Sequence, residues 1–140
     1  MTDTPIAARI RDSFDSQTMM QTLGGVFEHA EPGLVRLSAE VRPDLRQQQG
    51  VAHGGLVFTL ADSAAGYAAL SVMPENREVM TVEMKINMLA PGTGRLIAEG
   101  RVVRAGRRLV VVAADVWCGP DDTRRHVATL QGTMIPVDAQ

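Results

Sequence analysis

The stretch AHGGLVFTLADSAAGYAAL, residues 52–70, determines how this chain folds. Small and apolar residues fill almost all of it, which predicts one long helix over about residues 53–73. At about 1.5 Å per residue, such a helix is roughly 30 Å long. Because alanines cover the sides that the larger apolar residues leave free, we expect other elements to enclose this helix.

One carboxylate, Asp62, lies in the middle of this apolar run. The residues four positions away are Phe58 and Gly66, so no ion pair can form along the helix. Ionised carboxylates are rarely buried without a partner. Asp62 therefore either faces an exposed strip, pairs with an arginine from elsewhere, or serves as a general base or nucleophile in a partly dry site.

Two glycines, Gly54 and Gly55, stand at the start of the run. A helix start presents unpaired N–H groups and the positive end of the helix dipole, and without side chains a carbonyl oxygen could approach them as in an oxyanion hole. The glycines could instead permit a sharp turn or close packing. Gly54 and Asp62 are about 12 Å apart along the axis, too far to share one carbonyl carbon. If both serve one reaction, we expect a homodimer with antiparallel helices and two shared sites.

Alternating residues predict strands on both sides of the helix. In residues 33–42, GLVRLSAEVR, apolar and polar residues alternate, and a partner strand is expected at 26–30. After the helix we expect strands at 80–88, 94–104, 107–118 and 124–135, with a tight hairpin at Ala105-Gly106. In the first of these, alternation places Met80, Val82, Met84, Ile86 and Met88 on one face and Thr81, Glu83, Lys85 and Asn87 on the other.

The first 23 residues are expected to be helical. Thr4-Pro5 predicts a helix start, Asp15 or Ser16 is expected to cap a second short helix, and Gly24-Gly25 ends it. The order of elements predicts an α+β fold in which one antiparallel sheet wraps around one long central helix. We expect a single domain over residues 1–140, with 1–23 as an N-terminal helical segment.

Composition narrows the function classes. The net charge of −2 does not suggest a nucleic-acid partner. One cysteine and three widely separated histidines form no metal-ligand spacing, so no metal is expected. The charged N-terminus does not resemble a signal peptide, and no stretch is long and apolar enough to span a membrane. We therefore expect a soluble, cytoplasmic protein.

Two segments resemble a known family. Residues 50–68, GVAHGGLVFTLADSAAGYA, and residues 88–108, MLAPGTGRLIAEGRVVRAGRR, are similar to hotdog-fold acyl-CoA thioesterases, and most similar to the phenylacetyl-CoA type related to 4-hydroxybenzoyl-CoA thioesterases. The likeness spans about residues 15–133. It implies a hotdog fold, hydrolysis of an acyl-CoA to free acid and CoA, and no cofactor, since CoA belongs to the substrate. It also implies a homodimer with shared active sites, and a tetramer of two such dimers.

The resemblance implies roles for residues around the helix start. Asp62 matches the catalytic carboxylate, and Gly54 matches the residue whose N–H polarises the thioester carbonyl, with Gly55 beside the substrate. Gln47 matches an Asn or Gln near the thioester or the attacking water, although Gln48 and Gln49 compete for that role. His53 is expected to fix the loop before the helix, with proton transfer as the alternative.

The resemblance also implies substrate contacts downstream. Thr81 lies near the position at which some relatives have a Ser or Thr that helps to hold water. The alternation of the strand, however, places Thr81 on its polar face. Arg104, Arg107 and Arg108 cluster around one hairpin, where they could bind the CoA phosphates or form a solvated tip.

Two other functions are compatible with the fold. A hydratase or dehydratase acting on acyl thioesters would need a histidine working with an acidic residue. A non-catalytic acyl-CoA sensor would keep the pocket without needing Asp62. The acyl group stays open among aryl-acetyl, benzoyl-like, and short or medium fatty acyl groups, and the mechanism stays open between general base and anhydride formation.

Overall fold

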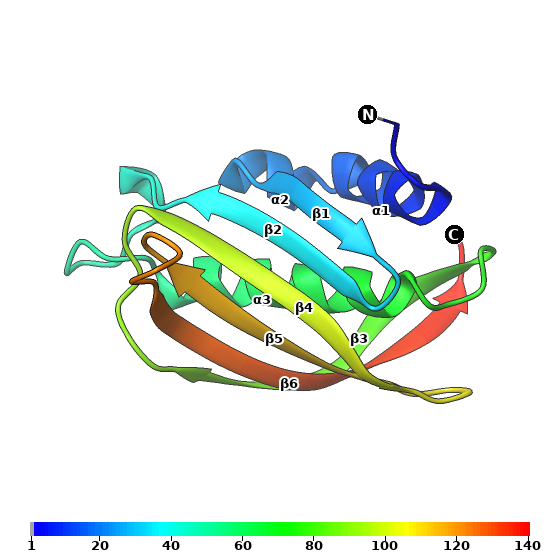
Figure 1. The fold of residues 1–140 in the computed structure, drawn as a ribbon. Coiled ribbons are helices and arrows are strands. Elements are labelled where there is room, and N and C mark those ends of the chain that lie inside the picture. The colour runs from blue at the N-terminus through cyan, green and yellow to red at the C-terminus, as the bar shows by residue number, and fades with distance from the viewer. Residues whose placement is uncertain (1) are drawn as a thin grey trace.

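Six strands form one antiparallel sheet that curls around a central helix (Figure 1). The computed structural model describes residues 2–140. The sheet order is β1-β2-β4-β5-β6-β3. The strands are β1 Val26–Glu31, β2 Leu34–Glu40, β3 Arg77–Met88, β4 Arg95–Ala105, β5 Val110–Cys118 and β6 Arg125–Asp138. The helices are α1 Pro5–Ser16, α2 Thr18–Leu23, the 3₁₀ turn Pro43–Leu45 and α3 Gly54–Leu70.

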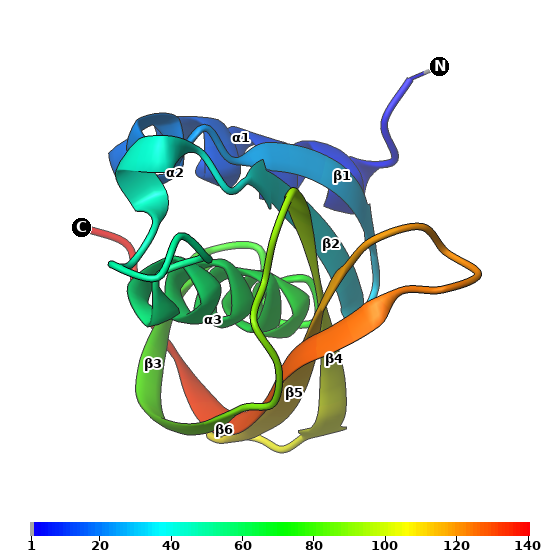
Figure 2. The same ribbon diagram turned by 90° about the vertical axis from the view of Figure 1, so that its left-hand side faces the viewer.

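Helix α3 is enclosed, as its composition predicts. Viewed along its axis, the sheet wraps around it on several sides (Figure 2). Every residue from Ala64 to Leu70 is buried. Gly100 of β4 makes this packing possible, because a Cβ there would lie 2.2 Å from the carbonyl carbon and oxygen of Ala64. The helix ends at Leu70 rather than near residue 73, and a tighter turn follows in which the Met73 amide donates to the Leu70 carbonyl.

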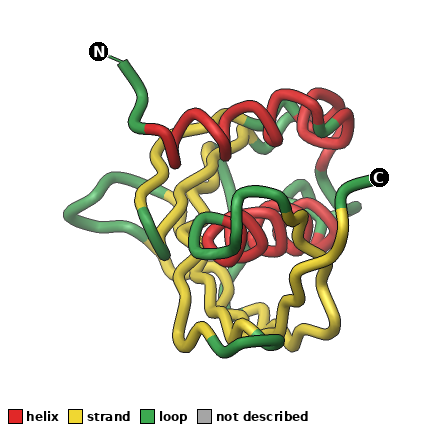
Figure 3. The backbone as a smooth tube through the Cα atoms, turned by 90° about the vertical axis from the view of Figure 1, so that its right-hand side faces the viewer, coloured by secondary structure: helices red, strands yellow, loops and turns green. Residues whose placement is uncertain are grey.

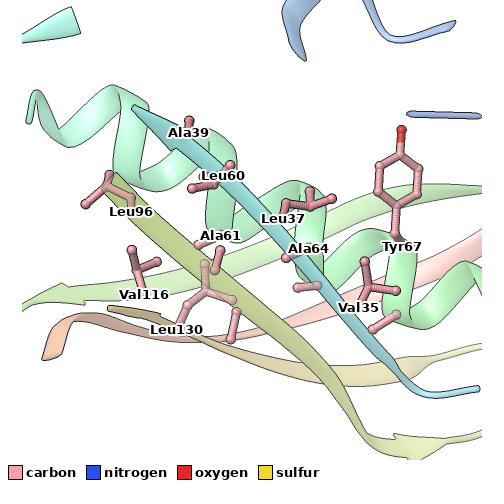
Figure 4. Packing of buried hydrophobic residues seen from close by; sticks show 14 of the residues in the cluster. Val35, Leu37, Ala39, Leu60, Ala61, Ala64, Tyr67, Leu96, Val116 and Leu130 are labelled. Atoms are coloured by element: carbon pink, nitrogen blue, oxygen red, sulfur yellow. The ribbon is translucent and has the colours of Figure 1, made fainter. Parts of the chain in front are cut away.

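The concave face of the sheet and α3 form one core (Figure 4). On β2, the apolar face is buried as the alternation predicts: Val35, Leu37 and Ala39 are fully buried. Ser38, on the face predicted to be polar, is fully buried as well, because its hydroxyl donates to Glu28 and accepts from Arg95. The three apolar residues pack with Leu60 and Ala64 of α3, while residues from α1 and from β4 to β6 complete the same cluster. Burial of this apolar surface is the main force that holds the sheet around the helix.

Strand β3 departs from the predicted alternation. Thr81 pairs with Met134 of β6, but Glu83 pairs with Thr133, so Val82 is an extra residue in a β-bulge. Because each strand residue points opposite to the next, one extra residue exchanges the two faces. The prediction that Met80 shares a face with Met84 and that Thr81 faces outward is therefore wrong. Thr81 points toward α3, and Met80 and Val82 are exposed.

The N-terminal helices cover the open side of the curled sheet (Figure 3). Thr4 caps α1 as predicted, since its Oγ1 accepts from the Ala7 amide at 3.1 Å. The predicted cap of α2 is wrong, because the helix begins after Gln17 and neither Asp15 nor Ser16 caps it. Gly24 ends α2 as predicted, with the left-handed φ of 67° that glycine adopts without strain.

Arg9 of α1 closes the C-terminal end of α3. Its guanidinium donates to the carbonyl oxygens of Leu70 at 3.1 Å, Met73 at 2.9 Å, Pro74 at 2.8 Å and Arg77 at 2.9 Å. The last carbonyls of a helix have no partner within the helix, so one arginine here satisfies the helix end and the connection to β3.

The β4–β5 hairpin is longer than predicted. Strand β4 ends at Ala105 and β5 begins only at Val110, so Arg107 and Arg108 lie in the connecting loop rather than at the start of a strand. The Gly106 amide donates to the Leu109 carbonyl at 2.8 Å and closes the loop. Strand β6 also runs further than predicted, to Asp138.

Candidate active site

Asp62 points toward β3 and is partly buried. Its Oδ1 accepts a hydrogen bond from the Thr81 hydroxyl at 2.9 Å. Within residues 2–140 no arginine, lysine or histidine forms an ion pair with it. Burial raises the pKa of Asp62 above its usual 3.8, and the Thr81 hydrogen bond opposes part of that increase. A carboxylate without a cation and with a raised pKa is typical of a general base or nucleophile rather than of a structural ion pair.

Thr81 reaches Asp62 because of the bulge in β3. Its Oγ1 also lies 3.2 Å from the Met134 sulfur, on the inner side of the sheet. The resemblance associated Thr81 with the site, whereas the simple alternation placed it outside. Only the register of β3 against β6 resolves this conflict, and that register is a tertiary property.

A pocket of about 430 Å³ opens beside Asp62. It lies between the N-terminal helices, α3 and the start of β3. The residues that line it include Ser13, Gln17, Asp62, Ser63, Tyr67 and Thr81. The carboxylate thus meets a cavity whose lining is rich in hydroxyl and amide groups.

The N-terminal helical segment contributes side chains that the sequence did not single out. The Gln17 amide donates to the Tyr67 hydroxyl at 2.9 Å, and its carbonyl oxygen accepts from the Ser63 hydroxyl at 3.4 Å. Ser13 lies 3.4 Å from the same Tyr67 oxygen. One signal was available: the only tyrosine of the chain lies within a helix predicted to be enclosed, and a buried tyrosine hydroxyl usually finds a partner.

At the start of α3, one amide is capped and one is free. His53 is the N-cap, and its Nδ1 accepts from the Gly55 amide at 2.8 Å. Among residues 2–140, no acceptor forms a hydrogen bond with the Gly54 amide. The Gly54 N–H, at the positive end of the helix dipole, is therefore available to a ligand oxygen.

Gln47 lies in the loop that precedes α3. Its side-chain oxygen accepts from the Gln49 amide, and its backbone bonds Val51 and Gly50 across the same turn. Within this chain, Gln47 therefore stabilises the loop that leads to His53 at the helix start. Its predicted contact with the thioester or with water stays a prediction.

The predicted catalytic residues fall into two groups within one chain. Gln47, His53 and Gly54 gather at the helix start, while Asp62 and Thr81 lie beside the pocket. Eight residues of α3 separate Gly54 from Asp62, or about 12 Å along the axis. A single chain does not bring both groups to the same carbonyl carbon.

The three arginines Arg104, Arg107 and Arg108 are exposed at the β4–β5 hairpin. Within the described chain, none of them forms an ion pair with a carboxylate. Their charges are therefore available to an anionic ligand.

Within residues 2–140, no cluster of three or more His, Cys, Asp and Glu side chains is placed to bind a metal ion. No helix there combines the length and the apolar character that crossing a membrane requires.

Comparison with known proteins identifies the family. A family model described as Thioesterase superfamily matches residues 49–124. A crystal structure of a thioesterase family protein from Silicibacter pomeroyi is 39% identical, with a TM-score of 0.91 over 96% of this chain and 99% of that chain. A candidate esterase of Saccharolobus solfataricus is 32% identical over 113 residues, 80% of this chain and 75% of the relative.

A more distant likeness concerns the fold alone. The PaaI protein of E. coli, from the phenylacetic acid degradation operon, has a TM-score of 0.83 at 19% identity, over 96% of this chain and 98% of that one. The expected fold is thus confirmed, and this chain is a hotdog-fold member of the thioesterase superfamily of hydrolases.

Proposed function

We propose that this protein hydrolyses acyl-CoA thioesters at two sites shared across a homodimer, with Asp62 of one subunit and the Gly54 amide of the other. The observation that carries the proposal is the pairing of a cation-free, partly buried Asp62 with an open helix start about 12 Å away along the same helix. Each feature suits one half of a thioesterase site, and only a second copy can bring the halves together.

The free edge of the sheet supports the dimer. Strand β3 is an edge strand, and unpaired edges invite pairing with another strand. Exposed apolar side chains lie along it and just after it: Met80 at 58%, Val82 at 53%, Met88 at 50% and Leu89 at 52%. Such a patch is typical of a protein interface. Two-fold pairing of β3 with its copy would set the two α3 helices antiparallel, as the shared site requires.

The chemistry follows from these groups. The thioester oxygen accepts from the Gly54 N–H, whose dipole stabilises the negative charge that develops there. The Thr81 hydroxyl holds Asp62 Oδ1, which leaves Oδ2 to face the substrate. Oδ2 either takes a proton from water as the water attacks the carbonyl carbon, or attacks that carbon itself to form an anhydride that water then cleaves. In both routes the CoA thiolate leaves and receives a proton.

The arginine hairpin completes the proposed substrate contacts. Arg104, Arg107 and Arg108 carry fixed positive charge on an exposed loop. The guanidinium fork suits phosphate oxygens, which the nucleotide part of CoA supplies. We assign these three side chains to that end of the substrate.

The alternative functions have less support. His53 uses Nδ1 to accept from the Gly55 amide as the N-cap of α3, so this nitrogen is not available for proton transfer to or from a bound acyl thioester. A sensor would have no use for a partly buried carboxylate that lacks a cation, because its desolvation destabilises the fold.

A thiol-release assay tests the proposal directly. Purified protein is given phenylacetyl-, benzoyl-, butyryl- and octanoyl-CoA, and free CoA is measured with a thiol reagent. At least one ester should be turned over by the wild type and not by Asp62→Asn. Sedimentation of both proteins measures the oligomer. No release from any ester would favour the sensor, and a monomeric active enzyme would contradict the shared site.

A further inference from the structure

The pocket beside Asp62 carries more polar groups than hydrolysis uses. Oxyanion stabilisation and water activation involve Gly54, Asp62 and Thr81. The opposite side of the pocket is built by the N-terminal helices, through Ser13 and Gln17, against Ser63 and Tyr67 of α3. Their role is left unexplained by the proposed reaction.

Gln17 is the centre of this polar wall. It lies at the junction of α1 and α2, and its side chain spans one turn of α3, from Ser63 to Tyr67. Tyr67 is only 5% exposed and belongs to the buried core, but its hydroxyl points away from the other labelled core residues (Figure 4) and lines the pocket. Gln17 and Ser63 are only half buried, so an occupant of the pocket can reach them.

The charge of the lining restricts the occupant. Asp62 and Glu78 both line the pocket, and no lysine, arginine or histidine is among its lining residues. A carboxylate brought in by the substrate would meet these two like charges without a counterion among the lining residues. The pocket therefore suits an uncharged group and disfavours a dicarboxylic acyl chain.

The spacing of residues along α3 sets how far the polar wall lies from Asp62. Tyr67 follows Asp62 by five residues, which is roughly 7.5 Å along the axis. When Asp62 faces the thioester carbon, the polar wall around Gln17 and Tyr67 lies near the far end of a medium-length acyl group. A six-carbon chain places its last atom at about this distance.

We propose that Gln17 and Tyr67 form a specificity-determining pair that recognises a hydroxyl or carbonyl oxygen near the far end of an uncharged acyl group. The proposal rests on the proposed thioesterase function and adds the chemical class of the acyl group. The Gln17 amide and the Tyr67 phenol can both donate to such an oxygen, and both can also accept from it when it belongs to a hydroxyl group. An unsubstituted chain would leave these groups without that partner.

Three esters of equal length test the proposal: 6-hydroxyhexanoyl-CoA, hexanoyl-CoA and adipoyl-CoA. For the wild type, kcat/KM should be highest for the hydroxylated ester and lowest for adipoyl-CoA. Gln17→Leu should reduce the ratio of hydroxylated to plain ester by about 10-fold, the effect of losing one or two hydrogen bonds to a buried polar group. Tyr67→Phe removes one oxygen and should reduce the same ratio in a side chain of unchanged shape.

A matched control separates recognition from support of the fold. Gln21→Leu changes another glutamine of the same segment, whose side chain donates to the Asp15 carbonyl and does not line the pocket. It should leave the ratio unchanged. A merely structural role of Gln17 would lower the rates for all three esters together and leave their ratios unchanged, which would overturn the proposal. Equal kcat/KM for the hydroxylated and plain esters in the wild type would do the same.

A binding measurement keeps this inference separate from the proposed function. The dissociation constants of non-hydrolysable thioether analogues of the same three esters are measured by calorimetry with wild type and Gln17→Leu. Tighter binding of the hydroxylated analogue, lost in Gln17→Leu, supports the specificity pair even if no ester is turned over, in which case only the thioesterase proposal fails. Equal binding of the hydroxylated and plain analogues overturns the specificity pair, whatever the turnover.

Discussion

The two halves of α3 differ in what surrounds them. Residues 64–70 are buried at every position and end under the guanidinium of Arg9. Residues 54–62 include the free amide of Gly54, the half-exposed Phe58 at 37% and the partly buried Asp62. The C-terminal half is therefore packed on all sides, whereas, within residues 2–140, the N-terminal half has an amide without an acceptor and a carboxylate without a cation. One helix can thus contribute its C-terminal half to the core and leave polar groups of its N-terminal half available to a ligand.

The largest effect is expected in the open half. Asp62→Asn should lower kcat/KM by about 10² to 10⁴-fold, the usual contribution of a positioned acid–base group. Thermal denaturation checks that the fold persists. Turnover within a few-fold of wild type would remove Asp62 from the mechanism.

The same variant gives a stability test with a defined sign. Because burial raises the pKa of Asp62, the folded chain binds this proton more tightly than the unfolded chain does. The carboxyl group therefore costs stability as pH rises from its ordinary pKa through the raised one. Asp62→Asn should raise Tm at pH 7, and this gain should disappear in acid. A lower Tm for Asp62→Asn at pH 7 would contradict this.

Removing the free amide should have the next largest effect. Gly54→Pro deletes the N–H at the first helical position, where proline is tolerated, and should lower kcat by about 10²-fold. Gly54→Ala keeps the amide, and its Cβ would meet only the flexible end of Met88 at 3.4 Å. The alanine variant should therefore be clearly more active than the proline variant. Equal activity of the two would exclude this N–H as the oxyanion donor.

In the anchored half, the expected loss is in stability. Gly100→Ala would place a methyl group 2.2 Å from the Ala64 carbonyl, so helix and sheet must separate. We expect a loss of about 3 kcal/mol or more in the free energy of unfolding, near the upper end of overpacking effects. Urea denaturation measures it. The control is Ser16→Ala, because Ser16 is exposed and its substitution leaves the core unchanged. Gly94→Ala is a poorer control, since Gly94 has a left-handed φ of 69° that would strain an alanine.

Arg9→Ala should weaken the closed end of the helix more moderately. It removes hydrogen bonds to four carbonyl oxygens, and we expect a loss of about 2 kcal/mol. Arg9→Lys retains the charge but not the planar fork and should recover only part of this stability. If Arg9→Ala is as stable as the wild type in urea denaturation, water molecules replace the Arg9 hydrogen bonds to these carbonyl oxygens without loss of stability.

The smallest effect is expected for Thr81→Val, which keeps the shape and removes the hydroxyl. The Thr81 hydrogen bond lowers the pKa of Asp62, so its loss should raise that pKa further. The acid limb of the kcat/KM profile, where activity appears as Asp62 ionises, should move to higher pH. A limb at the wild-type position would mean that this bond does not persist in the active enzyme.

Sequence periodicity was sufficient to predict the long buried helix and the inward face of β2. It also predicted that Asp62 has no basic neighbour along α3. These features depend only on residues that are close in the chain. Periodicity was also sufficient for the axial distance between Gly54 and Asp62, on which the proposal of a shared site is based. The face of Thr81 could not be obtained in this way, since the bulge exists only through the pairing of β3 with β6. The contact of Gln17 with Tyr67 likewise joins residues 50 positions apart. Local patterns specify which side of an element is apolar, whereas register and long-range packing decide which polar groups meet, and here those groups line the pocket beside Asp62.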